Sequence, residues 1–212
     1  YSCYIVVSYY LKQKEMNTKA RILTLLFFTI STIGFCQDHK REIEGQFLNY
    51  NNLIIKKDFN KSMAYLPEEF FEIIPKEQMI MVMEKTFSNP EMEFELKSPK
   101  IDEISEVEKI GDKFYVLLTY SSPMKMKFTN SEEQEEGENK LRINMLKMSM
   151  EQMFGSENVK YDEETEFFDI VAKKQAYAIS GNGKSDWRFL VIEKKQKFIL
   201  DKLLPAQLVE KI

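Results

Sequence analysis

The amino-acid sequence predicts an α+β domain in which helices pack on one face of a curved antiparallel sheet. Three observations support this class. Apolar residues recur at helical spacing over residues 40–87 and 141–154, they alternate with a period of two over 91–128 and after 158, and glycine turns separate the alternating segments. Helices and strands therefore occupy separate blocks of the chain, which is typical of α+β folds, and no repeat of a solenoid or propeller is visible.

The first block predicts helices. The residues Ile43, Phe47, Tyr50 and Ile54 follow one another at spacings of four, three and four, which places them on one side of a helix over about residues 40–58. A short helical turn at 66–69 follows, and Pro75 suits the first position of a third helix. We expect its buried face to consist of Met79, Ile80, Met83 and Phe87, and its end to lie at Ser88-Asn89-Pro90.

The second block predicts strands. Phe94 and Leu96 alternate with charged residues, residues 101–110 mix apolar and acidic side chains, and Gly111-Asp112 predicts a tight turn. The next strand is expected to point Phe114, Val116, Leu118 and Tyr120 to one side. We expect Ser121-Ser122-Pro123 to interrupt the sheet, alternation to resume over 124–128, and the acidic segment 130–139 to form a loop.

The last part of the chain repeats this order. Residues 141–154 predict a helix with Ile143, Leu146, Met150 and Met153 on its buried face, ended by Gly155. Short strands are expected at 158–161, 167–171 and 174–179, then a hairpin turn at 181–183 and a strand led by Trp187, Phe189 and Val191. A turn at 193–196 leads into 197–203, and Pro205 starts a closing helix over 206–212.

The segment Met16–Gln37 has the three parts of a secretory signal. Lys19 and Arg21 precede an apolar run from Ile22 to Phe35, which is shorter than the roughly 20 residues that span a bilayer. We expect cleavage after Cys36, with a retained anchor, an apolar element of the fold, or a lipidated Cys36 as the alternatives. Residues 1–15 are interpreted as upstream sequence translated before Met16, so the predicted domains are 1–15, 16–36 and 37–212.

Composition excludes several classes of function. The chain carries 30 Lys and Arg against 34 Asp and Glu, which argues against nucleic acid as a partner. Both cysteines precede the expected cleavage site, and His39 is the one histidine. The expected domain therefore has no thiol and a single imidazole with which to form a catalytic site. No phosphate-binding or dinucleotide motif occurs in the expected domain, and we predict no cofactor and no metal.

The order of elements resembles a known family. A first helix ending in Lys57-Asp58-Phe59, a turn at Tyr65-Leu66-Pro67-Glu68, a helix led by Pro75 and strands ending in Trp187-Arg188-Phe189-Leu190 are similar to secreted NTF2-like proteins of Bacteroidota. The chain departs from that pattern through the helix at 141–154 and the strands after it. The resemblance implies a cone-shaped α+β fold, and it implies little about function, because such folds serve as enzymes, ligand carriers and modules without known activity.

A curved sheet under helices commonly leaves a pocket lined by aromatic residues. The candidate ligand-binding residues are Tyr115, Tyr120, Tyr177 and Trp187, which fall on predicted strands, with core packing as the alternative. The three most interesting carboxylates, which lie among apolar residues, are Asp58, Asp169 and Asp186. Each could instead be a cap, a solvent-facing strand residue or a turn former.

These residues support three hypotheses. The first is an exported, non-enzymatic module of the periplasm or cell exterior that binds a small apolar ligand or a protein partner. The second is a lyase, isomerase or hydrolase that uses carboxylates and tyrosines, which requires two carboxylates roughly 5–9 Å apart in a cavity. The third is a homodimer formed through the exposed face of the sheet. No stable membrane anchor is expected after cleavage.

Overall fold

A computed structural model describes residues 39–129 and 136–212 of the chain. The predicted upstream segment and secretory signal, and residues 130–135 of the predicted acidic loop, lie outside the described residues. The compact unit described below comprises residues 42–212. Within the described ranges, no helix combines the length and hydrophobicity needed to cross a membrane.

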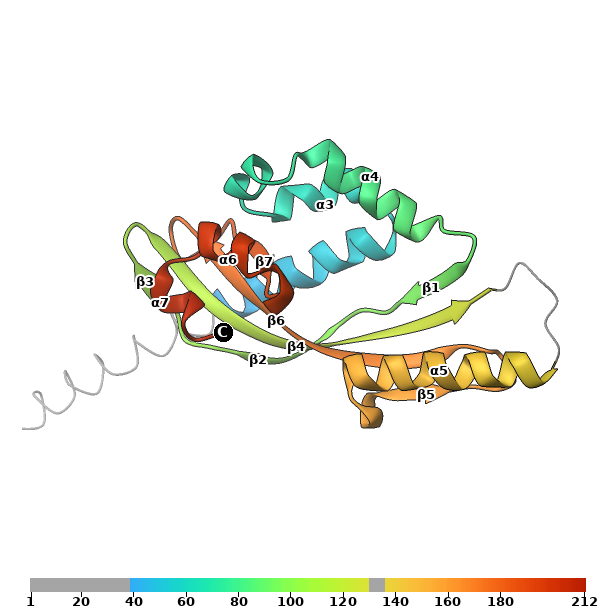
Figure 1. Ribbon diagram of the computed structural model, residues 1–212. Helices are drawn as coiled ribbons and strands as arrows, with labels where there is room; N and C mark the ends of the chain where they lie inside the picture. The colour runs from blue at the N-terminus through green and yellow to red at the C-terminus, as the bar shows by residue number, and fades with distance from the viewer. Residues whose placement is uncertain (1–38, 130–135) are drawn as a thin grey trace, which may run out of the picture. The chain divides into compact units, whose positions relative to one another are not determined.

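The described residues form the predicted α+β fold around two long antiparallel strands. Strands β4 (Lys113–Phe128) and β6 (Phe168–Ser180) pair from Phe114↔Ser180 to Met126↔Phe168 (Figure 1). The outer edge of β4 pairs with β1 (Met92–Leu96), β2 (Lys100–Ile104) and β3 (Glu108–Ile110). The outer edge of β6 pairs with β5 (Val159–Tyr161) at one end and β7 (Arg188–Val191) at the other.

Helices occur at most of the predicted positions. The described α-helices are residues 39–55, α3 (Phe59–Ser62), α4 (Lys76–Phe87), α5 (Glu136–Phe154), α6 (Lys197–Leu203) and α7 (Ala206–Val209). Short 3₁₀ turns are η1 (Met63–Tyr65), η2 (Glu68–Glu72), η3 (Ser156–Asn158) and η4 (Lys194–Gln196). The sequence predicted only that segment 197–203 follows a turn, and the structure shows that it forms helix α6.

The main core lies on both faces of one half of the sheet. Alternate residues of a strand share a face, and the front face is the one that carries Val116, Leu118 and Tyr120. The helix at 39–55 covers it, since the Phe47 ring lies 4.8 Å from the ring of Tyr120 and 5.1 Å from that of Phe189. These T-shaped contacts confirm the predicted apolar side of the first helix.

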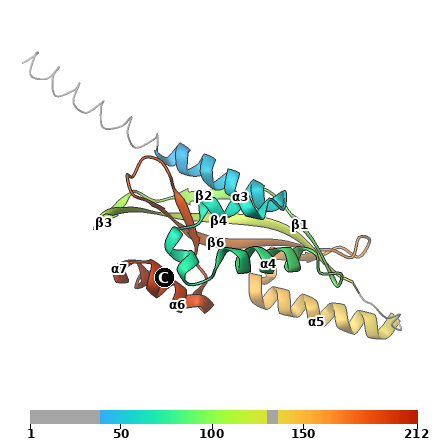
Figure 2. The same cartoon turned by 90° about the horizontal axis from the view of Figure 1, so that it is seen from above.

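The back face of the same half is covered by the C-terminal helices. Tyr115 and Tyr177 point to this face, and both are buried in one cluster with apolar residues of α6 and α7. The Nζ of Lys211 also lies 2.8 Å from a carboxylate oxygen of Glu108, which fastens the end of the chain to β3. We expected helices on one face, and the structure adds α6 and α7 on the opposite side from the helix at 39–55 (Figure 2).

A second, smaller core lies over the other half of the sheet. It consists of the buried residues Met126, Val159, Phe168 and Ile170. Helix α5 covers them with the partly buried residues Ile143, Leu146, Met150 and Phe154. The predicted inner position of Met153 is wrong, because Phe154 points inward and the side chain of Met153 is 62% exposed. Gly155, with φ of 91°, follows the helix as predicted.

The predicted interruption at residues 121–123 is also wrong, since β4 continues through it and Pro123 pairs with Val171. The C=O of Pro123 accepts a hydrogen bond of 3.1 Å from the N–H of Lys97, after the end of β1. Both backbone groups of a strand residue point to the same edge. The missing proline N–H therefore faces the interval between β1 and β2, where no strand requires a donor.

Several predicted boundaries move, and the predicted closing helix over 206–212 ends at Val209. The first helix ends at residue 55 because Lys57 adopts a positive φ of 59° and the N–H of Asp58 bonds to the C=O of Leu53 at 2.8 Å. The predicted strands 167–171 and 174–179 are one strand, β6. Residues 136–139, predicted as loop, belong to α5, in whose first turn Glu138 suits the positive end of the helix dipole.

Candidate functional site

The four aromatic candidates are core residues of the structure. The exposed fractions of Tyr115, Tyr120, Tyr177 and Trp187 are 5%, 5%, 4% and 0%. Tyr120 lies on the front face, whereas Tyr115 and Tyr177 lie on the back face, so the sheet separates them. None of the four lines either of the two pockets described below. The structure does not bring them together as one site.

Burial keeps these tyrosines protonated. It raises the pKa of Tyr120, with smaller contributions from Tyr50 and Glu193, and it raises the pKa of the core residue Tyr50 to about 12. A phenol with a raised pKa can donate a hydrogen bond but cannot act as a base near neutral pH. The indole N–H of Trp187 is buried without a partner among the described residues, while its backbone N–H donates to the side-chain oxygen of Gln46 at 3.0 Å.

The three candidate carboxylates have separate local roles. Asp58 caps α3 and lies 2.6 Å from the Nζ of Lys61, and this contact holds the pKa of Asp58 below its ordinary value. Asp169 is a half-exposed strand residue paired with Lys125, and Asp186 lies in the loop between β6 and β7 with a φ of 56°. These are the structural roles that the sequence left as alternatives.

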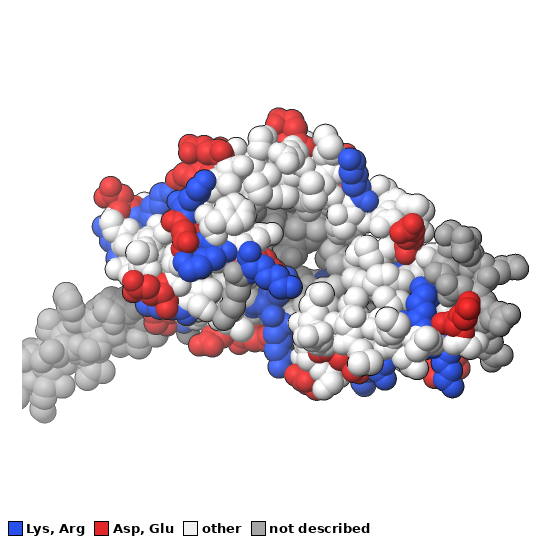
Figure 3. Space-filling model, in the orientation of Figure 1, with Lys and Arg blue, Asp and Glu red and all other residues white. Residues whose placement is uncertain are grey.

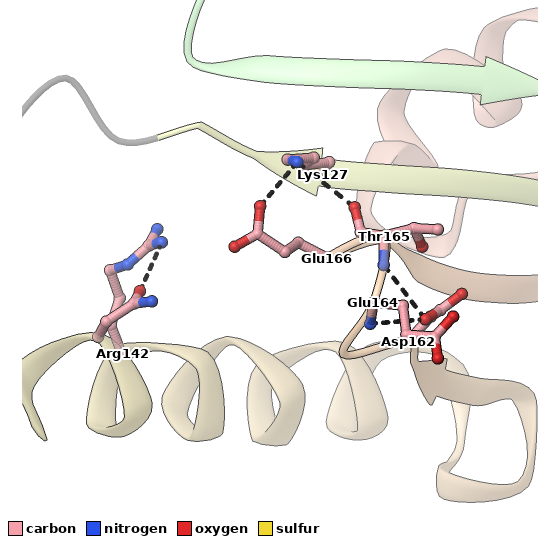
Figure 4. Close-up of polar contacts among 7 residues, drawn as sticks. Lys127, Arg142, Asp162, Glu164, Thr165 and Glu166 are labelled. Atoms are coloured by element: carbon pink, nitrogen blue, oxygen red, sulfur yellow. Dashed lines mark hydrogen bonds and ion pairs between the residues drawn. The ribbon is translucent and has the colours of Figure 1, made fainter. Parts of the chain in front are cut away.

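A charged cluster at the β5–β6 hairpin is structural. The carboxylate of Asp162 accepts hydrogen bonds from the backbone N–H groups of Glu164 and Thr165 at 3.0 and 3.3 Å (Figure 4). The Nζ of Lys127 lies 2.7 Å from Glu166 and fastens the hairpin to β4. These partners occupy the carboxylates of Asp162 and Glu166, and the described residues contain no cluster of metal-ligating side chains.

A pocket of about 820 Å³ lies at an edge of the sheet. We call it the edge pocket. It occupies the interval along β6 between the last pair with β5, Val159↔Ile170, and the first pair with β7, Ala176↔Val191. Its lining comprises Thr119, Gln152, Met153, Phe154, Ala172, Lys173, Lys174, Gln175, Ile192, Glu193 and Lys195.

Backbone groups of β6 are available in this interval. The C=O of Gln175 accepts the N–H of Ile192 at 2.9 Å, so Gln175 faces the edge that β7 occupies. Every second residue of a strand points its N–H and C=O to the same edge, and the register of β6 is continuous. The backbone groups of Val171 and Lys173 therefore face the pocket side, where the described residues supply no pairing strand.

The pocket combines positive charge with apolar surface. Lys174 forms an ion pair with Glu193, while the exposed Lys173 and Lys195 form no ion pair with any described residue. Figure 3 shows basic side chains gathered between α6 and the C-terminal end of α5. Apolar surface comes from Phe154, Ala172 and Ile192, among others. The arrangement suits a ligand that has an anionic group beside an apolar portion.

A smaller pocket of about 280 Å³ contains two carboxylates, Glu157 and Asp169, together with Lys97 and Lys160. The side chain of Asp169 is 48% exposed and lies 3.6 Å from the Nζ of Lys125. A general acid needs a buried environment that raises its pKa. Asp169 is instead about half exposed and paired with Lys125, and Glu157 is exposed, so the edge pocket is the better candidate site.

Sequence reasoning missed the lysines of the edge pocket. A signal was present, because Lys173-Lys174 lies where the first of two predicted strands, 167–171, is followed by the second, 174–179. We interpreted residues 172–173 as the break between two strands, whereas β6 is continuous there and lacks a pairing strand only on the edge that β5 and β7 occupy.

Comparisons with known proteins found no relative for this chain. No family model matches it, and neither the curated proteins nor the solved structures yield a match. The resemblance to NTF2-like proteins therefore stays a prediction.

Proposed function

We propose that the chain is a non-enzymatic binding module whose edge pocket takes a small amphipathic anion, a molecule with an apolar body and a carboxylate or similar group. The observation that carries the proposal is a pocket of about 820 Å³ lined by apolar side chains and by two exposed lysines without an ion-pair partner in the described structure. Export to the periplasm or cell exterior is part of the proposal and is supported by the sequence of Met16–Gln37.

The anionic group of the ligand is assigned to the β6 side of the pocket. There the ammonium groups of Lys173 and Lys195 supply positive charge, and the unpaired backbone N–H of Lys173 supplies a hydrogen-bond donor. The apolar body would contact Phe154, Ala172 and Ile192. This refines the prediction of a purely apolar ligand, because a neutral hydrocarbon would leave the lysines and backbone groups without partners.

Calorimetric titration with decanoate and decanol tests this proposal, because the two probes share an alkyl chain and differ in charge. We expect decanoate to bind saturably to one site and decanol to bind more weakly. The double variant Lys173→Gln/Lys195→Gln is expected to weaken decanoate binding by roughly three- to tenfold, the range for exposed charge pairs. Lys184→Gln removes an exposed lysine outside the pocket and is the matched control. Equal binding of both probes, or an equal effect of both variants, would contradict the proposal.

A further inference from the structure

Helix α5 is apolar on two opposite sides. Its inner side packs on the second core through Ile143, Leu146, Met150 and Phe154. On its outer side Leu141, Met145 and Met148 are 63%, 62% and 69% exposed, at spacings of four and three that form one stripe. A helix with one partner normally places polar and charged residues on its solvent side.

The outer side of α5 also lacks charge. Between residues 141 and 153 the exposed positions are Leu141, Asn144, Met145, Met148, Ser149, Gln152 and Met153. None of these side chains is charged, although charged residues make up 30% of the chain. Charged residues of this segment, such as Arg142 and Glu151, lie on the flanks of the stripe. Such a surface is typical of a helix–helix interface.

We propose that this stripe binds the same stripe of a second copy, so that the two α5 helices pair antiparallel in a homodimer. Positions 141, 145, 148 and 152 repeat with the alternating spacing of four and three that two paired helices share. An antiparallel pair that sets Met145 against Met148 of the second copy also sets Leu141 against Gln152 of that copy. The stripe is thus complementary to itself under a single twofold axis.

Charge complementarity favours the antiparallel direction. Glu138 lies in the first turn of α5, directly after an acidic stretch of the sequence. At the other end of α5, Met153 and Phe154 line the edge pocket beside Lys173 and Lys195. The antiparallel register brings Glu138 level with Gly155 of the second copy, next to those lysines, whereas a parallel pair would place two acidic ends side by side.

The stripe extends over about three helical turns, so the interface is smaller than the roughly 800 Å² per partner of a standard stable complex. We therefore expect a dimer that dissociates on dilution. This interface differs from the exposed sheet face that the sequence suggested for dimerisation, and it adjoins the edge pocket at Gln152 and Met153.

Sedimentation equilibrium of the full chain over a range of concentrations tests the dimer. Met145→Lys places a charge in the stripe and is expected to raise the dissociation constant at least roughly tenfold, or about 1.4 kcal/mol. Met81→Lys is the matched control, because Met81 is an apolar residue of α4 that is 52% exposed. A monomer at every concentration, or equal effects of the two variants, would overturn the proposal.

Cysteine crosslinking tests the direction of the pair in a full chain that carries Cys3→Ser and Cys36→Ser. The double variant Leu141→Cys/Gln152→Cys is expected to form a covalent dimer under oxidising conditions. Leu141→Cys alone is expected to stay uncrosslinked, because an antiparallel pair separates its two copies by about 16 Å along the helix axis. A covalent dimer of Leu141→Cys alone would show a parallel pair and overturn the antiparallel arrangement.

Discussion

Glu193 and Lys174 form an ion pair that joins the chain directly after β7 to the middle of β6. Both side chains line the edge pocket, so this pair forms part of its wall. Glu193 is the one carboxylate among the lining residues and neutralises one of the pocket lysines. The pair therefore sets how much positive charge remains for a ligand.

Replacement of this carboxylate is expected to improve anion binding. Glu193→Gln removes the negative charge and releases Lys174, so we expect decanoate to bind more tightly by calorimetry. Because the two side chains are 43% and 34% exposed, the loss of unfolding free energy should stay below about 1 kcal/mol in urea denaturation. Weaker decanoate binding by Glu193→Gln, at unchanged stability, would contradict the assignment of the pocket to anions.

The turn between β6 and β7 depends on one glycine. Gly183 has a φ of 70°, and a Cβ atom there would lie 2.8 Å from the ring of Phe114. Gly183→Ala is expected to lower the free energy of unfolding by about 1–2 kcal/mol from the backbone conformation alone, and by more through the clash. Gly181→Ala, whose Cβ meets nothing within 4 Å, is the control and should stay within about 0.5 kcal/mol of the parent.

Acid should destabilise the fold partly through Glu69. A hydrogen bond from Lys113 holds the pKa of the Glu69 carboxyl below its ordinary value of 4.5. Because the folded state has the lower pKa, the stability from this contact is present above the unfolded pKa and is lost as the pH falls through the folded pKa. Urea midpoints measured from pH about 5 down to about 3 should fall less steeply for Glu69→Gln than for the parent chain. Parallel slopes would contradict the role of this contact.

Trp187 is expected to report on the core and not on the ligand. It is the one tryptophan of the chain, is fully buried, and does not line the edge pocket. Its fluorescence maximum should therefore stay in place when decanoate saturates the protein, and Trp187→Phe should keep the affinity for decanoate. A spectral shift of the parent chain with decanoate, together with a loss of affinity in Trp187→Phe, would show that Trp187 belongs to the ligand site.

The sequence predicted the class of fold because apolar periodicity separates helices from strands. The sequence predicted local details wrongly where a residue type is compatible with two different structures. Pro123 is compatible with a strand only because its missing N–H faces the interval between β1 and β2, and that interval is a property of the pairing. Because apolar residues lie on both sides of α5, the sequence did not show whether Met153 or Phe154 points into the core.

The candidate site was harder to predict than the fold. The sequence proposed aromatic residues such as Tyr120 and Trp187 as pocket residues, and the structure buries them in the core, which the sequence had left as the alternative. The edge pocket exists because β5 and β7 leave one edge of β6 unpaired between them. Strand pairing of this kind joins residues far apart in the sequence, so the importance of Lys173 and Lys195 becomes visible only in the fold.

The most direct test of the ligand site is a map of amide chemical shifts by NMR during titration with decanoate. The account predicts saturable shifts at Phe154, Ala172 and Lys173, which line the edge pocket, and little change at Tyr115 and Tyr177 under α6 and α7. Shifts confined to those core tyrosines, or no saturable shift at β6, would contradict the assignment of the edge pocket as the ligand site.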